Sequence, residues 1–280
     1  MEPLLYRGAR TPGVDSLITF AEQAATALYE DDRVRITWLT GSLASGTADS
    51  QSDVDLRVAI QPEGFLQIGE WWHELIDCIH PTVWKRLWSG PPDVVMGAIS
   101  TEYTRFDVVA QSVADTRPRT YEAVFVLFDK DGVAKNINLT APPPQGDAFA
   151  NLPNTVEEFI RLLGMLTIVI GRNDLPIAME GHFACQSLLI SLLLLENGID
   201  RMTMGKRHVA ELLNDEQRDL FAHLPTLAPT MESITQGRMA YARIFLPRAR
   251  RLMDAHGLVY PEAFESATLQ YLRDTLGLHM

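Results

Sequence analysis

Residues 39–60 read LTGSLASGTADSQSDVDLRVAI, and they contain the most specific pattern in the chain. The apolar residues from 34 to 39 predict a β-strand, and Gly41-Ser42 ends that strand. A short segment rich in serine, glycine and alanine follows, and apolar residues then alternate to the end of the quoted segment, which predicts a second strand. Asp53 and Asp55 begin this second strand. Because they are two residues apart, both side chains lie on the same face.

The sequence around this segment predicts a mixed α/β half. Apolar residues over 14–30 have the spacing of an amphipathic helix, and a second helix is expected at about 64–79. Further strands are expected at 94–99, 104–111 and 123–128. Strands and helices mixed in this way are typical of an α/β domain, which we place at residues 1–141.

The pattern changes after residue 141. Residues 142–154 contain Pro142-Pro143-Pro144 and Pro153, which cannot continue a sheet, so we interpret them as a linker. Thr155 and Glu158 have the spacing of a capping box, which predicts a helix from Thr155 to about residue 170. More helices are expected at 177–196, 206–213, 233–255 and 261–276. The sequence therefore predicts an α+β fold in which a helical bundle over 155–280 follows the α/β domain.

Composition excludes several kinds of partner. The chain has 280 residues, of which 46% are hydrophobic and 21% are charged, as is typical of a soluble globular protein. Its net charge is −12, whereas proteins that bind polynucleotides usually carry a basic face, so we expect no nucleic-acid partner. Cys78 and Cys185 are the only cysteines, which excludes a disulfide framework and a cysteine metal site.

Two observations bear on localisation. The aliphatic run at 187–195 is shorter than the roughly 20 apolar residues that a membrane span needs, so it predicts a buried helix. The N-terminal segment lacks the uninterrupted apolar core of a signal peptide. We therefore expect a cytoplasmic protein that does not enter a membrane and that is a monomer or a homodimer.

Three carboxylates are the candidates for catalysis. Asp53 and Asp55 share a strand face, where they can converge on one or two Mg²⁺ ions. Asp107 is the only acidic residue within an apolar strand, a costly position for a carboxylate unless it faces a cation or an open site. Two metal ions about 3.5–4 Å apart can clamp the attacking and leaving oxygens of a phosphoryl displacement. Gly41 allows close approach of the backbone to a phosphate and Ser42 offers a hydroxyl, so we expect the triphosphate there.

These residues carry a resemblance to a known superfamily. Residues 39–46, 52–56 and 106–108 resemble, in this order, the motifs of the polymerase-β nucleotidyltransferases. The order of helix, strand, Gly-Ser, acidic strand and later single carboxylate is also similar. An α/β domain joined to a helical bundle resembles the antibiotic nucleotidyltransferases, especially the aminoglycoside adenylyltransferases and lincosamide nucleotidyltransferases.

The resemblance implies a reaction and a set of roles. The enzyme would transfer AMP or another nucleoside monophosphate from ATP or another NTP to a hydroxyl of a small acceptor, and release pyrophosphate. An aminoglycoside or lincosamide acceptor would give antibiotic resistance. Asp53 and Asp55 would be metal ligands, with Asp107 as the third carboxylate. Either Asp107 or a glutamate of the bundle, for which Glu180 is our candidate, would be the general base.

Two further bundle residues are candidates for nucleotide binding. Lys206 follows a glycine at a predicted helix start, where a cation suits a triphosphate, and the resemblance implies a bundle lysine on the phosphates. Tyr241 is placed where a bundle tyrosine would reach the nucleotide. For both residues, as for Glu180, ordinary packing or surface exposure is the alternative.

Other interpretations stay open. The chain could be an antitoxin-type nucleotidyltransferase that modifies a protein or a tRNA, or a nucleotide-binding module without catalysis. Asp107 could simply bond a backbone amide at a strand end. We interpret Trp71, Trp72, Trp84 and Trp88 as packing aromatics rather than a ligand platform, and the arginines between 238 and 251 as a solvated helix face.

Overall fold

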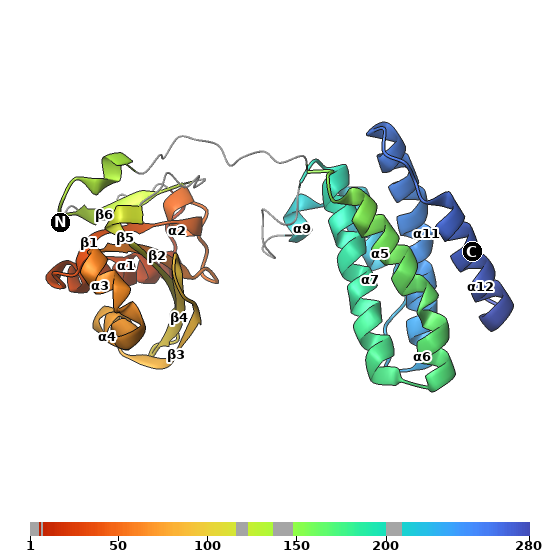
Figure 1. Ribbon diagram of the computed structural model, residues 1–280, viewed down its shortest axis with the longest axis horizontal. Helices are drawn as coiled ribbons and strands as arrows, with labels where there is room; N and C mark the ends of the chain where they lie inside the picture. The colour runs from red at the N-terminus through yellow and green to blue at the C-terminus, as the bar shows by residue number, and fades with distance from the viewer. Residues whose placement is uncertain (1–5, 7, 116–122, 137–147, 200–208) are drawn as a thin grey trace. The chain divides into compact units, whose positions relative to one another are not determined.

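The computed structural model describes residues 6, 8–115, 123–136, 148–199 and 209–280. The chain forms two compact units, Met1–Pro144 and Gln145–Met280, each with its own hydrophobic core. Figure 1 shows that the sheet belongs to the first unit and that the second unit is built from helices. The predicted α+β fold class is therefore confirmed.

The first unit is built on a mixed six-stranded sheet with the order β3-β4-β5-β2-β1-β6 in its described part. The strands are β1 (Val34–Leu39), β2 (Val54–Ile60), β3 (Thr82–Ser89), β4 (Val94–Ser100), β5 (Arg105–Ser112) and β6 (Phe125–Asp129). β2 and β5 are parallel, and the other neighbouring pairs are antiparallel. β1 has its predicted bounds, β2 begins at Val54 so that Asp53 lies just before it, and β4, β5 and β6 lie within two residues of their predicted bounds.

Helices α1, α3 and α4 pack on one face of the sheet. The helices of this unit are α1 (Pro12–Glu30), α2 (Gly41–Ser45), α3 (Pro62–Leu66) and α4 (Ile68–Ile79), with 3-10 helices η1 (Val113–Asp115) and η2 (Val133–Asn136). Residues of α1, α3 and α4 form the largest core cluster together with Leu56, Val58 and Phe106 of the strands. Side chains alternate along a strand, so Asp55, which precedes Leu56, lies on the opposite face. The candidate carboxylates are therefore on the side of the sheet away from α1 and α4.

Strand β3 is absent from the sequence-based prediction. It occupies one end of the sheet and most of its side chains are exposed or half-buried, so it has no buried alternating row for a pattern to reveal. The helix predicted at 64–79 is also divided, because α3 ends at Leu66 and α4 begins at Ile68.

The second unit is all-helical in its described part. Its helices are α5 (Leu152–Gly164), α6 (Leu166–Arg172), α7 (Leu175–Glu196), α9 (Val209–Leu212), α10 (Asp215–Ala222), α11 (Met231–Ala255) and α12 (Glu262–Leu276). Buried residues of α5, α7 and α11 form most of the core. Phe159 and Phe245 stack inside it with ring centroids 3.8 Å apart. The predicted helical half is confirmed, although α10 was not predicted.

The start of α5 differs from the prediction. The helix begins at Leu152, with Asn151 as the residue before its first turn, so Thr155 lies inside the helix. The Thr155 hydroxyl donates to the Asn151 carbonyl at 3.0 Å instead of capping the helix. Pro153 lies in the first helical turn, where the missing N–H costs nothing, so this proline begins a helix rather than ending a linker.

Helix α7 is long and apolar enough to cross a membrane by length and composition. Its buried residues include Ala178, Cys185, Leu189 and Leu193, which belong to the core of the second unit. A helix that is apolar on most sides is also typical of the centre of a helical bundle. Within the structure, 39% of the apolar stretch of α7 is buried.

Candidate active site

Asp53, Asp55 and Asp107 come together on one face of the sheet. β2 and β5 run parallel in a register that pairs Asp55 directly with Asp107. Paired residues on neighbouring strands point to the same side, and Asp53 is two residues before Asp55, so all three share that side. One carboxylate oxygen from each residue lies within 4.8 Å of the other two. The expectation that Asp107 approaches the acidic pair is met by the geometry.

Backbone contacts hold the start of β2 against the start of β5. In the loop before β2, Asp49 and Ser52 form a turn in which the Asp49 amide donates to the Ser52 hydroxyl at 3.0 Å. Arg105, the first residue of β5, donates from its guanidinium to the Gln51 carbonyl. The Arg105 contact therefore links the loop before Asp53 to the strand that carries Asp107.

The three carboxylates are half-buried, which raises the cost of keeping like charges together. Each of them takes part in a hydrogen bond, ion pair or electrostatic interaction within the chain, as does Arg57, which lies two residues after Asp55. The donor set consists of carboxylate oxygens only, which is the chemistry that Mg²⁺ and Ca²⁺ prefer over softer metals. The residues present therefore fit a hard divalent cation.

Gly41 is required by its backbone angle and by its neighbour. Its φ is +63°, a left-handed conformation that glycine adopts at no steric cost. A Cβ at this position would overlap the Oδ2 atom of Asp55. The absent side chain therefore leaves the space beside the backbone in which the Asp55 carboxylate lies.

Ser42 adds a hydroxyl group to the turn that follows β1. Its Oγ atom is buried and has no hydrogen-bond partner among the described residues. A buried hydroxyl without a partner is costly, and such groups in native proteins commonly bind a water, an ion or a ligand. Thr40 makes no side-chain cap for α2, so its hydroxyl does not occupy the backbone N–H groups at the start of this helix.

A second acidic pair with the same spacing has a structural explanation. Asp129 accepts hydrogen bonds from the amides of Val133 and Ala134 at 2.9 and 2.8 Å, and so holds the start of η2. Asp131 pairs with Arg35 at 2.6 Å, which lowers the pKa of its carboxyl group. Neither carboxylate belongs to the described metal-ligand group. The two pairs look alike in sequence, but only Asp53 and Asp55 converge on a third acid.

The bundle candidates have different positions. Tyr241 is only 3% exposed and its hydroxyl lies 3.0 Å from His182 Nε2, within the core of the second unit. Burial raises the pKa of Tyr241. This placement contradicts the expected nucleotide contact, because the hydroxyl is enclosed and already bonded. Lys206 lies outside the described residues.

Glu180 is exposed on α7 and lines a small cavity. Arg238 lines the same cavity and is 1% exposed, with its guanidinium donating to the carbonyls of Leu162 and Ala178 at 3.2 and 2.8 Å. The interpretation of the 238–251 arginines as a solvated face is therefore wrong for Arg238. The role of Glu180 as a general base stays a prediction.

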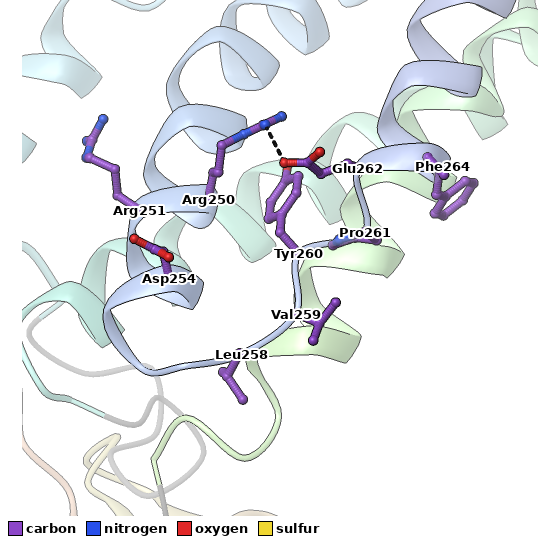
Figure 2. A pocket seen from close by; sticks show the side chains of 10 residues that line it. Arg250, Arg251, Asp254, Leu258, Val259, Tyr260, Pro261, Glu262 and Phe264 are labelled. Carbon is purple, nitrogen blue, oxygen red and sulfur yellow. Dashed lines mark hydrogen bonds and ion pairs between the residues drawn. The ribbon is translucent and has the colours of Figure 1, made fainter.

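Figure 2 shows a larger hollow in the second unit, between the end of α11 and the start of α12. Its main cation, Arg250, pairs with Glu262 at 3.1 Å and with Glu265 at 2.8 Å. The same guanidinium lies 4.7 Å from the centre of the Tyr260 ring. These contacts of Arg250 join the two helices.

Two of the tryptophans do not have the expected packing role. Trp71 and Trp72 are 6% and 8% exposed, as the packing interpretation predicts. Trp84 and Trp88 in β3 are 42% and 49% exposed, so that interpretation is wrong for them. The sequence does not show where on the sheet these two rings lie. Their position follows from the pairing of β3 with β4 and of β4 with β5.

The chain matches no protein-family model and no curated protein sequence. Among solved structures, it is similar to an aminoglycoside 6-adenyltransferase from Bacillus subtilis, with a TM-score of 0.38 and 12% identity over 89% of this chain and 97% of that chain. It is also similar to a nucleotidyltransferase-like protein from Exiguobacterium sibiricum 255-15, with a TM-score of 0.37 and 12% identity over 92% of this chain and 88% of that chain. At these TM-scores the two likenesses carry no argument about the function of this chain.

Proposed function

We propose that the chain is a metal-dependent nucleotidyltransferase that transfers a nucleoside monophosphate, AMP from ATP, to a hydroxyl of a small-molecule acceptor. One observation carries the proposal: the parallel register of β2 and β5 places Asp55 beside Asp107, and Asp53 joins them within 4.8 Å. Three carboxylates on one face of the sheet, beside a glycine-serine turn, match the needs of phosphoryl transfer between oxygens.

Asp53, Asp55 and Asp107 would hold the divalent cation, for which Mg²⁺ is our candidate. A bound divalent cation neutralises charge on the phosphates and on the attacking oxygen. Without a cation, three half-buried carboxylates would repel the phosphates of ATP. A bound cation would reduce this repulsion and so favour nucleotide binding.

Gly41 and Ser42 would hold the phosphates that leave. The buried Ser42 hydroxyl has no hydrogen-bond partner among the described residues and would donate to a phosphate oxygen, while the space left by the missing Gly41 side chain holds the Asp55 carboxylate. Lys206 remains our candidate for a second contact to the triphosphate.

In the proposed reaction the acceptor hydroxyl oxygen forms a bond to the α-phosphorus, and the bond from that phosphorus to the bridging oxygen breaks. Pyrophosphate leaves with the electron pair, and the hydroxyl proton passes to a carboxylate. Asp107 is one candidate for that general base and Glu180 is the other. A positioned base contributes roughly 10²- to 10⁴-fold in rate.

The acceptor class follows from charge and from the resemblance. A net charge of −12 favours a small cationic compound over a polynucleotide. An aminoglycoside or a lincosamide fits this description, and we expect the reaction to take place in the cytoplasm. Modification of a protein or a tRNA is the alternative outcome of the experiment below.

The test is an incubation of the purified chain with ATP labelled at the α-phosphate, Mg²⁺ and a panel of aminoglycosides and lincosamides. We expect a labelled acceptor and pyrophosphate, both lost in Asp55→Asn and after removal of Mg²⁺ by a chelator. Asp131→Asn is the matched control, because that carboxylate pairs with Arg35 outside the cluster. If incubation with cell lysate labels a protein or RNA band and no small molecule, the acceptor is a protein or a tRNA instead of a small compound.

A further inference from the structure

Two exposed indole rings lie on β3, at the edge of the sheet. Trp84 and Trp88 have ring centroids 6.2 Å apart, and each leaves nearly half of its surface exposed. Large aromatic side chains that are exposed together are unusual on a soluble surface, and they commonly mark a binding site.

These rings lie beside the carboxylates because of strand register. Arg86 in β3 pairs with Gly97 in β4, Gly97 pairs with Asp107 in β5, and Asp107 pairs with Asp55 in β2. Partners in successive pairs point to the same face of the sheet. Since strands are about 4.8 Å apart, the Cα atoms of Arg86 and Asp107 are about 10 Å apart.

Gly97 is the one residue without a side chain in this row of paired residues. A Cβ at Gly97 would overlap the Trp88 ring, so the indole lies directly against the glycine backbone. The register between β3 and β4 shifts from Leu87 to Ser89, and this irregularity brings the Trp88 ring to the face that carries Asp107. Glycine in a strand commonly marks such a close approach of another group. The six-membered ring of Trp88 therefore lies over β4, one strand away from Asp107, and is tilted by 50° from the Trp84 ring.

The order of the strands separates two sides of the carboxylate cluster. Gly41 follows β1, which is the neighbour of β2 on one side, whereas β4 and β3 lie beyond β5 on the other side. In phosphoryl transfer the attacking and leaving oxygens lie on opposite sides of the phosphorus, roughly in line. If pyrophosphate leaves toward Gly41, the acceptor approaches from the side of β4 and β3. This step depends on the proposed function.

We propose that Trp84, Arg86 and Trp88 form the acceptor-binding platform, and that the acceptor is a polyhydroxylated ring of the sugar or cyclitol type. The apolar C–H face of the ring packs on the indoles, and its hydroxyl groups accept hydrogen bonds from the Arg86 guanidinium. The reacting hydroxyl then reaches the metal cluster at Asp107. The site is continuous with the cluster, because one row of paired residues connects them.

The experiment uses the full chain and four variants: Trp88→Ala, Trp84→Ala, Arg86→Ala and Trp88→Phe. Val83→Ala is the control, since Val83 is an exposed hydrophobic residue on the same strand but outside the row. Calorimetry measures the binding of Mg²⁺-ATP, and initial rates measure KM for the best acceptor among myo-inositol, methyl glucoside, lincomycin and streptomycin. Circular dichroism confirms that each variant is folded.

We expect Trp88→Ala to raise the acceptor KM at least about tenfold, while Trp88→Phe stays within about threefold because it keeps a flat ring. The affinity for Mg²⁺-ATP should stay within about twofold of the wild type in every variant. If Trp88→Ala does not fold, the same increase in acceptor KM is required of Trp84→Ala or Arg86→Ala.

Three results would overturn the platform. If the acceptor KM is unchanged in all folded alanine variants, the platform proposal is wrong and the nucleotidyltransferase proposal is unaffected. A loss of Mg²⁺-ATP affinity in Trp88→Ala, without an effect in Val83→Ala, assigns the indoles to the nucleotide instead. Absence of turnover by the wild type with every compound counts against the proposed function itself, and the platform falls with it.

Discussion

Replacement of Gly41 by alanine tests the carboxylate cluster without changing any carboxylate. At φ +63° an alanine is in the left-handed region, which costs about 1–2 kcal/mol. In addition, the new Cβ would overlap the Oδ2 atom of Asp55, so the carboxylate has to move. The substitution thus combines a general cost in stability with a local displacement at the proposed metal site.

The two effects have different sizes. The backbone cost should appear in full in the free energy of unfolding of the first unit. A displacement of about 1 Å in a catalytic group can reduce the rate by about 100-fold. We therefore expect Gly41→Ala to lose about 1–2 kcal/mol of stability and at least about 100-fold in kcat/KM.

Gly132→Ala is the matched control. Gly132 has φ +68°, so an alanine there carries the same backbone cost, but no atom lies within 4 Å of the position of its Cβ. Urea unfolding should give similar losses of stability for both variants, and calorimetry with Mg²⁺-ATP should show weaker binding only for Gly41→Ala. Initial rates of AMP transfer should change less than about threefold in Gly132→Ala.

Equal activity in the two glycine variants would refute this reasoning. It would mean that the position of the Asp55 carboxylate against the Gly41 backbone has no bearing on metal or nucleotide binding. A large loss in both variants would attribute the effect to backbone strain, and it would leave the contact with Asp55 without support.

Three more predictions follow from single contacts. Asp53→Asn should retain the fold and lose both turnover and Mg²⁺-ATP affinity; unchanged calorimetric binding would count against Asp53 as a metal ligand. Burial, and then the nearby charge of Arg238, keep the pKa of His182 below 6.5, so the unfolded chain takes up the proton first as the pH falls. The free energy of unfolding should therefore decrease as the pH falls below about 6.5, by at most about 1.4 kcal/mol per pH unit, and urea titrations of His182→Gln should lack that dependence. Phe159→Ala should cost about 3–5 kcal/mol, because the ring is fully buried and stacked on Phe245, and a cost below about 1 kcal/mol in the same assay would contradict this packing.

Much of the fold could be predicted because most elements bury one face. Strands β1 and β2 and helices α1 and α11 show the period of their secondary structure in the spacing of apolar residues, and their bounds agree with the structure within two residues. Strand β3 could not be found in this way, since it contributes little to the core. The start of α5 was misjudged because Pro153 was assigned to the linker, although proline is also favoured in a first helical turn.

The carboxylates were predictable for a local reason. Asp53 and Asp55 have their spacing fixed by the strand period, and Asp107 is conspicuous as an acid within an apolar strand. Their approach then needs only that β2 and β5 are neighbours in the right register. Tyr241 had no comparable signal, because the sequence does not show whether a tyrosine on a helix faces the core or the solvent.

The position of Trp88 depends on contacts between residues that are far apart in the sequence. Its place beside Asp107 requires two strand pairings and the absence of a side chain at Gly97. Exposed side chains on an edge strand can be substituted at a cost of about 0.5 kcal/mol or less, whereas the buried residues of β2 and β5 cannot. A change of acceptor can therefore arise through β3 without loss of the fold or of the metal site. If the platform is correct, substitutions at Trp84 and Arg86 should alter the ranking of acceptors while the affinity for Mg²⁺-ATP stays constant.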